Sequence, residues 1–245
     1  MIRFICIAIF LILFLILSIP LLFLEWVIGT FNSEKKDYHS LRIVQWAFKK
    51  ILAITGVEVT VIGEELVPDE AVLFIGNHRS FFDILLTYSR CKRLTGYVAK
   101  KEMEQIPLLS TWMKRLYCLF LDRENPKEGL KTILKGIDYI KKGISICIFP
   151  EGTRNKGEEL SILPFHEGSF KISTKTGCPI VPISLNHTSA IFEDHFPRIK
   201  KVHVVMEYGT PIYPRELDAE EKKHIGMYCQ NLIQTTIHKN MELLS

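Results

Sequence analysis

A histidine and an aspartate lie in one short polar segment that directly follows a continuous apolar run. The run covers residues 71–76, and His78 and Asp83 follow it with four residues between them. Such a run is typical of a strand buried on both faces, and α/β proteins place functional side chains where these strands end. On one continuous helix the two side chains would point about 140° apart. The spacing therefore predicts a bend from strand to helix between them, which would let the carboxylate meet the imidazole.

An imidazole oriented by a carboxylate is suited to general base catalysis. A purely structural histidine beside a helix start is the alternative. A zinc site is poorly supported, because the sequence has no His-Glu-x-x-His and no closely spaced cysteine pair, and we expect no metal. Gly-x-Ser-x-Gly is also absent, which leaves Ser80 as a weak candidate nucleophile. We expect His78 to activate a hydroxyl of the substrate.

Two further polar segments follow apolar runs and carry arginine. Residues 144–149 are apolar and lead through Pro150 into Glu-Gly-Thr-Arg, which ends at Arg154; a second run leads into Arg123. Arginine binds phosphate through a planar fork of donors, and glycine permits close approach of the backbone to a ligand. A solvated turn is the alternative for the first segment, and a salt bridge is the alternative for Arg123. Together with His78, these segments predict one active site at the ends of several strands.

The rest of the chain alternates between strand-like and helix-like segments. Asn125 followed by proline begins a helical apolar pattern that ends at Gly143. This alternation predicts an α/β fold, a largely parallel sheet flanked by helices. Strands are expected at 57–61, 72–75, 95–99, 117–121, 144–149, 180–185 and 202–208, and helices at 81–88, 108–116, 125–143, 168–176 and 216–244.

The N-terminal segment is hydrophobic enough for a membrane. No charge occurs from Phe4 to Leu24, and as a helix this stretch would be about 31 Å long, the thickness of a bilayer's hydrocarbon core. A signal peptide needs a small-residue cleavage site, which is missing, and burial in a soluble core does not suit a helix that is apolar on all sides. We expect a retained anchor over residues 1–30, either crossing the bilayer or dipping into one leaflet.

An amphipathic helix at the membrane surface is expected over residues 31–55, with an ordinary packed helix as the alternative, and the α/β domain is expected over 56–245. Basic residues are more frequent after the apolar run than before it, which places this domain on the cytoplasmic face of the cell membrane. The six cysteines show no paired spacing and suit a reducing compartment. A net charge of +4 without a reading helix or zinc spacing gives no support for nucleic-acid binding.

Four segments resemble, in order, the motifs of the glycerolipid acyltransferases. Residues 77–83 are similar to the first motif, a histidine and an aspartate separated by four residues. Residues 117–123 resemble the second, 149–154 (Phe-Pro-Glu-Gly-Thr-Arg) match the third, and 179–183 resemble the fourth. Within this family, the 1-acylglycerol-3-phosphate (lysophosphatidic acid) acyltransferases are the most similar group, and the resemblance covers most of the chain.

The resemblance implies transfer of an acyl group from acyl-CoA or acyl carrier protein to the sn-2 hydroxyl of lysophosphatidic acid, a membrane lipid, which gives phosphatidic acid. His78 would take the hydroxyl proton, Asp83 would orient the ring, and no cofactor or acyl-enzyme would be needed. Further site residues are implied in two groups. Those that bind the substrate phosphate are Arg123, Glu151, Gly152, Thr153 and Arg154, and those in supporting positions are Asn77, Ser80 and Pro182.

The sequence departs from the family pattern at two positions. His166 stands where family members often have lysine, and Tyr117 stands where glycine is common. These departures leave open another lysophospholipid or an acylated amino-acid lipid as the acceptor. A non-catalytic lipid-binding protein and a hydrolase that uses Ser80 with His78 are two further hypotheses. The donor, the chain-length preference and the oligomeric state do not follow from the sequence.

Overall fold

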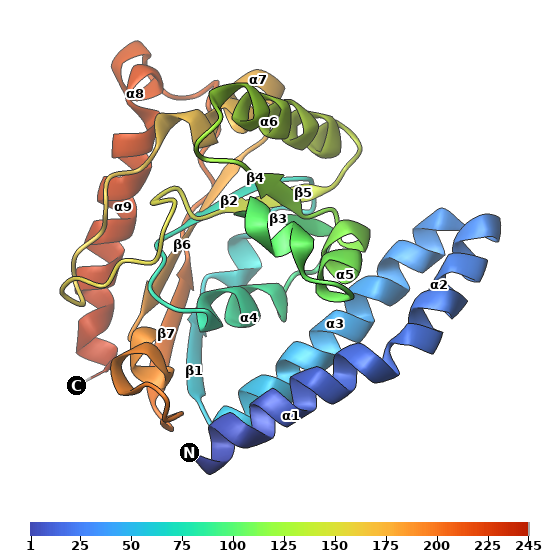
Figure 1. The fold of residues 1–245 in the computed structure, drawn as a ribbon. Coiled ribbons are helices and arrows are strands. Elements are labelled where there is room, and N and C mark those ends of the chain that lie inside the picture. Colours follow the sequence, from blue (N-terminus) through green and yellow to red (C-terminus); the bar gives the residue numbers. More distant parts are fainter. Residues whose placement is uncertain (245) are drawn as a thin grey trace.

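The computed structural model describes residues 1–244 and contains a twisted seven-stranded sheet in the order β1-β7-β6-β2-β5-β3-β4 (Figure 1). All neighbouring strands are parallel except β6 and β7, which confirms the predicted fold class. Each of the seven predicted strands is present within a few residues of its expected position. Their bounds are β1 Glu58–Ile62, β2 Leu73–Gly76, β3 Thr95–Lys100, β4 Leu119–Leu121, β5 Ser145–Ile148, β6 Ile180–Asn186 and β7 His203–Tyr208.

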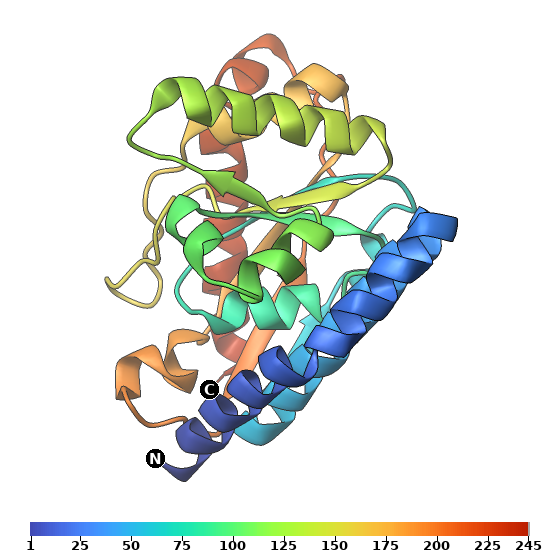
Figure 2. The same ribbon diagram turned by 45° about the vertical axis from the view of Figure 1, so that its right-hand side comes forward.

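Helices cover both faces of the sheet, which explains the uninterrupted apolar runs of its central strands. Along β2, Phe74 belongs to the core on one face, whereas Leu73 and Ile75 belong to the core on the other. The first face packs against α3, α4 and α5, and the second packs against α6, α7 and α9 (Figures 1 and 2). The helix bounds are α3 Ser33–Thr55, α4 Phe82–Tyr88, α5 Leu109–Arg115, α6 Pro126–Lys141, α7 Lys171–Thr176, α8 Ala219–Lys223 and α9 Ile225–Asn240.

The central strands β2, β5 and β3 run parallel and side by side, so their carboxyl ends lie at one edge of the sheet. The loop that contains His78 follows β2, and the loop that contains Glu151 follows β5. Arg123 follows β4, which stands three positions from β2 in the sheet. The topology therefore places the predicted site at this edge, with its two main loops on adjacent strands.

The N-terminal apolar segment is a bent pair of helices and not the single helix expected from the sequence. The first helix, α1 (Ile2–Leu17), and the second, α2 (Ile19–Phe31), meet at Ser18 with a 44° bend. Pro20 explains the break, because proline cannot donate a backbone hydrogen bond and its ring clashes with the preceding turn. At the bend, the Ser18 hydroxyl donates to Leu15 O (2.8 Å) and accepts from Trp112 Nε1 (2.9 Å).

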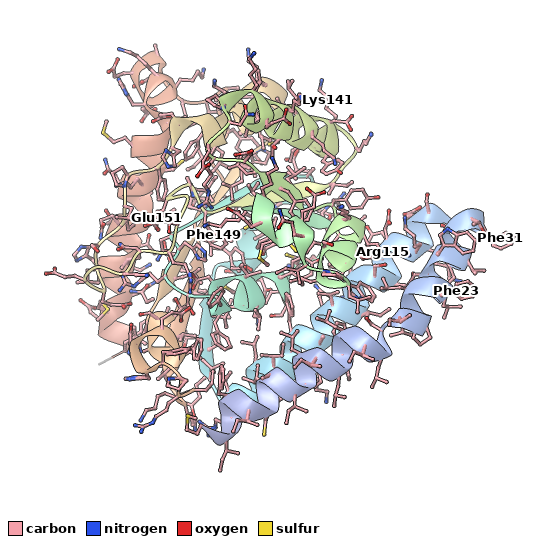
Figure 3. All side chains as sticks on the ribbon, viewed as in Figure 1. Phe23, Phe31, Arg115, Lys141, Phe149 and Glu151 are labelled. Atoms are coloured by element: carbon pink, nitrogen blue, oxygen red, sulfur yellow. The ribbon has the colours of Figure 1, made fainter. Side chains whose placement is uncertain are left out.

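The two helices and α3 form an arm that projects beyond the sheet (Figures 1 and 2). Among residues 1–244, no single helix is long and apolar enough to cross a bilayer, and only α1 and α2 taken together meet that requirement. Phe23 and Phe31 lie toward the far end of the arm (Figure 3), and Phe31 is 88% exposed. One face of α3 is buried in the core through Leu41, whereas Trp46 is 52% exposed. The arm thus combines a packed inner face with an apolar outer face.

The predicted C-terminal helix over 216–244 is interrupted at His224, which separates α8 from α9. Asp218 begins α8 with a capping box formed with Glu221. At the start of α9, both carboxylate oxygens of Glu167 accept from the N–H of Gly226, at 3.1 and 3.2 Å. A Cβ at position 226 would lie 2.6 Å from a Glu167 oxygen, so this glycine allows the carboxylate to cap α9.

Candidate active site

The chain bends between His78 and Asp83 as the spacing predicts. His78 lies in the loop after β2, and Asp83 lies in the first turn of α4. Asp83 Oδ2 lies 2.8 Å from His78 Nδ1 and also accepts from the backbone N–H groups of Arg79 (2.7 Å) and Ser80 (2.8 Å). The carboxylate is fully buried, so these three donors fix its position. His78 Nε2 makes no hydrogen bond within residues 1–244, and this nitrogen is free to accept a proton from a ligand.

The loop after β5 holds the other side of the imidazole. The ring of Phe149 stacks on the ring of His78, with centroids 4.4 Å apart and planes 19° apart. Glu151 Oε1 accepts from His78 N (2.6 Å), and its Oε2 accepts from Leu163 N (2.8 Å). Phe149 and Glu151 lie close together in Figure 3. These contacts fix the backbone and the ring face of His78, while Asp83 fixes its Nδ1.

Glu151 is itself buried, and burial raises the pKa of its carboxyl group above the usual range. The N–H groups of His78 and Leu163 oppose this shift, because they stabilise the ionised form. Both carboxylate oxygens are engaged with backbone donors. The side chain therefore has no free oxygen edge for a ligand, and its visible role is to join the two loops.

Arg154 lies beside the loop of the predicted base. Its guanidinium carbon lies 3.7 Å from the centroid of the Phe81 ring, and its Nη1 donates to Glu193 Oε1 at 3.0 Å. Glu193 also accepts from Ser80 Oγ (2.7 Å) and from Phe81 N (2.8 Å). The sequence suggests a salt bridge to a carboxylate as the alternative role of Arg123. In the structure, it is Arg154 that forms such a salt bridge. It places a cation next to the segment that contains His78.

The three predicted supporting residues occupy structural positions. Asn77 exchanges two hydrogen bonds of 2.9 Å with the backbone of Leu185 and so extends the pairing of β2 with β6. Pro182 is buried in β6, opposite Ile75 of β2, at the point where the antiparallel ladder with β7 begins. Ser80 is fully buried, and its hydroxyl donates to Glu193 and accepts from Phe82 N (3.0 Å). No hydrogen bond joins Ser80 to His78 within residues 1–244.

Gly152 and Thr153 complete the loop after β5. Gly152 has φ +69°, a conformation that favours glycine, and a Cβ there would lie 3.2 Å from the ring of His166. His166, which stands where the family often has lysine, therefore packs against this turn. Thr153 is exposed and makes no hydrogen bond in the part of the chain that the structure describes.

Arg123 does not join the cluster around His78. It makes no hydrogen bond or ion pair within the described residues; burial lowers its pKa, and the charge of Glu102 opposes that shift. Three strand spacings of about 4.8 Å separate the ends of β2 and β4, or about 14 Å. The placement of Arg123 at the same edge of the sheet is confirmed, but its contact with the phosphate stays a prediction.

Tyr117, the other departure from the family pattern, has φ +60°, which explains why glycine suits this position. A Cβ at Gly96 would lie 2.2 Å from Tyr117 O, so the chain passes very close to β3 here. The strand predicted from residue 117 consequently begins only at Leu119. The Tyr117 hydroxyl donates to Asp37 Oδ2 of α3, which ties this segment to the arm.

Comparison with known proteins agrees with this geometry. A family model described as acyltransferase matches residues 58–186, a segment that holds the His78–Asp83 pair and Arg154. The chain belongs to the acyltransferase family. A 1-acyl-sn-glycerol-3-phosphate acyltransferase of Saccharomyces cerevisiae is 30% identical over 72% of this chain and 58% of its own length, so the match spans little more than half of that relative. A protein of the same name from Borreliella burgdorferi is 31% identical over 84% of this chain and 80% of its own length.

The acyltransferase fold extends over nearly the whole chain. The crystal structure of the 1-acyl-sn-glycerophosphate (LPA) acyltransferase PlsC from Thermotoga maritima aligns with a TM-score of 0.74 at 23% identity and covers 97% of both chains. At this level of identity the likeness shows the fold. The superposed length includes the arm of α1, α2 and α3, which the family model does not include.

Sequence reasoning missed several residues that shape this candidate site. Phe149 was assigned only to the end of an apolar run and the start of the third motif, with no role of its own, although it stacks on His78. Arg79 is buried, and its guanidinium donates to the carbonyls of Gly157 and Glu158, both at 2.8 Å, which pins the loop beyond Arg154. Glu193 lies outside every motif, and nothing in its local sequence distinguishes it. Within residues 1–244, no cluster of three or more side chains could hold a metal ion.

Proposed function

We propose that this protein transfers a fatty acyl group from acyl-CoA or acyl carrier protein to the sn-2 hydroxyl of 1-acyl-glycerol-3-phosphate, giving phosphatidic acid. The observation that carries the proposal is the His78–Asp83 pair with a free Nε2, in a segment whose Phe81 ring packs against the guanidinium of Arg154. A base and a phosphate-binding cation at one site match an acceptor that has both a hydroxyl group and a phosphate. The names of the matched relatives add support.

In the proposed reaction, His78 Nε2 takes the proton of the acceptor hydroxyl while its oxygen attacks the thioester carbonyl carbon. A carbon–oxygen bond forms and the carbon–sulfur bond breaks. The imidazolium then gives its proton to the departing thiolate, which leaves as the thiol and restores neutral His78. Asp83 stabilises that imidazolium through the hydrogen bond at Nδ1. General base catalysis contributes about 10²–10⁴-fold in rate. Fixed positioning of the two substrates supplies the remainder.

The surroundings of Ser80 favour direct transfer over an acyl-enzyme. A serine nucleophile needs a hydrogen bond to its base, whereas the Ser80 hydroxyl is buried and directed to Glu193. In the direct mechanism, Arg154 binds the acceptor phosphate, Arg123 binds a second phosphate oxygen, and the backbone of Gly152 and Thr153 lines the approach. Glu151 keeps the two loops in register.

We further propose that the arm seats the enzyme in the cytoplasmic leaflet of the cell membrane. The outer faces of α1 and α2 are apolar, and Trp26 and Phe31 are exposed near the far end. The packed partner helix α3 carries a pair of lysines near each end, which favours a position at the interface over a span across the bilayer. The acceptor, itself a membrane lipid, would then reach the site without leaving the membrane.

The test is an acyl-transfer assay with the purified full-length chain in mixed micelles. Lysophosphatidic acid is compared with lysophosphatidylglycerol and monoacylglycerol, each with acyl-CoA and with acyl carrier protein as the donor. We expect phosphatidic acid as the main product and its loss in His78→Ala, whereas His224→Ala, an exposed histidine between α8 and α9, keeps full activity. Phosphatidic acid formation at the normal rate by His78→Ala would refute the mechanism. Preference for monoacylglycerol would refute the acceptor.

A further inference from the structure

A carboxylate outside all sequence motifs joins the two loops of the site. Glu193 lies in a short 3-10 turn between β6 and β7. Its Oε2 accepts from Ser80 Oγ at 2.7 Å, and its Oε1 accepts from Phe81 N at 2.8 Å and from Arg154 Nη1 at 3.0 Å. The first two donors belong to the loop after β2, and the third belongs to the loop after β5. Glu193 therefore fixes Arg154 relative to the segment that holds His78.

The guanidinium of Arg154 is held on an edge and on a face. Glu193 binds Nη1, and the ring of Phe81 packs against the guanidinium plane. The Nη2 and Nε groups make no hydrogen bond in the part of the chain that the structure describes, and the side chain is 29% exposed. An arginine restrained in this way has already lost much of its rotamer entropy, and its remaining donors are available to an anion.

We propose that Glu193 is a positioning residue that presents Arg154 to the acceptor's phosphate and so determines specificity for phosphate-bearing acceptors. The proposal rests on the proposed function, because it takes Arg154 as the ligand of the phosphate. In this role Glu193 does not touch the substrate. Its carboxylate orients the guanidinium in advance of binding, as a carboxylate behind a charged ligand-binding group commonly does.

The opposite role, in which Glu193 occupies the phosphate's place and must leave, fits the structure less well. The Ser80 hydroxyl that binds Glu193 is fully buried, so a phosphate could replace the carboxylate there only if the turn moved away. That turn is held from behind, because Phe192 stacks on Phe4 of α1 with ring centroids 5.6 Å apart and contacts Phe196 at 5.4 Å. The carboxylate is therefore a fixed part of the site.

The two roles predict opposite changes in the apparent affinity for the acceptor. We expect Glu193→Gln to raise KM for lysophosphatidic acid about tenfold, because Arg154 loses a charge-assisted hydrogen bond that orients it. KM for acyl-CoA and kcat should stay within about twofold of wild type. The matched control is Asp194→Asn in the same turn. Within residues 1–244 this carboxylate accepts only from Ser189 Oγ (2.9 Å), so the substitution should leave both KM values unchanged.

A double-mutant cycle separates positioning from a general structural effect. In an Arg154→Gln background, Glu193→Gln should change KM for the acceptor by less than about twofold, since the residue it orients is gone. Equal effects in both backgrounds, or an unchanged or lower KM in the single variant, would overturn the proposal. If the wild type acylates a different phosphate-bearing lysolipid, the proposed acceptor is wrong, and the same cycle with that lipid still tests Glu193. A wild type that acylates no phosphate-bearing lipid rejects both proposals.

Discussion

Replacement of Asp83 by asparagine tests the role of the carboxylate with almost no change in shape. Loss of a hydrogen bond to a charged group costs about 1.5–3 kcal/mol. The attraction between unit charges about 4 Å apart is worth about 4 kcal/mol at an effective dielectric constant of 20. These contributions overlap at the Oδ2–Nδ1 contact of 2.8 Å, so together they give about 3–4 kcal/mol. At 1.36 kcal/mol per tenfold, we expect kcat to fall by about 10²–10³-fold.

The assay is kcat with saturating lysophosphatidic acid and acyl-CoA, measured beside the thermal midpoint of each protein. The new amide nitrogen of Asp83→Asn would replace Oδ1, which is buried without a hydrogen-bond partner, so we also expect a loss of about 1–3 kcal/mol in stability. Asp138→Asn, an exposed carboxylate of α6 paired with Lys142, is the control for loss of a surface charge. A folded Asp83→Asn enzyme that keeps more than a tenth of wild-type kcat would refute the reasoning.

Three further predictions concern the site loop and the arm. The pKa of Glu151 is raised, so the folded state binds the carboxyl proton more tightly than the unfolded state. The stability of wild type relative to Glu151→Gln should therefore fall as pH rises above about 4.5. A stability difference between the two proteins that is the same at all pH values would contradict this. Gly152→Ala should lower the free energy of unfolding by about 1–2 kcal/mol from its left-handed φ, and by more from the contact with His166. The loss should exceed that of Gly143→Ala, where φ is also left-handed but a Cβ meets open space. Calorimetry of the two variants measures the difference. Phe31→Ser should weaken binding to phosphatidylglycerol vesicles in a flotation assay by about tenfold or more. Leu130→Ser, at an exposed position of α6, should leave this binding unchanged. Equal effects of the two substitutions would contradict insertion of the arm into the membrane.

The fold was predictable because each strand is a short apolar or alternating run bounded by polar segments. The seven strands and the start of α6 at Pro126, capped by Asn125, follow from local patterns that the tertiary structure leaves intact. The two breaks that were missed have different causes. Pro20 breaks the N-terminal helix at Ser18, where Trp112 donates to the serine hydroxyl, and the first turn of α9 is capped by Glu167, which is distant in sequence. Periodicity predicts helices well, but it does not show where a contact from another element ends one.

The site was predictable as far as it depends on strand ends. His78 and Glu151 follow adjacent strands of the sheet, and their predicted proximity is confirmed by the hydrogen bond between them. Glu193 could not be predicted, because its role arises from three hydrogen bonds to residues at least 39 positions away. The role of Phe149 was hidden by its place in an apolar run, where it reads as core.

The geometry also bears on which arginine binds the phosphate first. Arg154 is braced by Glu193 beside the loop of the base, whereas Arg123 has no bracing contact within residues 1–244 and follows a strand about 14 Å from β2. A small headgroup whose hydroxyl must reach His78 Nε2 therefore meets Arg154 in a fixed position. Arg123 has to reorient to reach the phosphate and would lose side-chain entropy when the phosphate binds. Arg154 has already lost this entropy on folding. We therefore expect Arg154 to set the affinity for the acceptor and Arg123 to add to that affinity after the headgroup is bound.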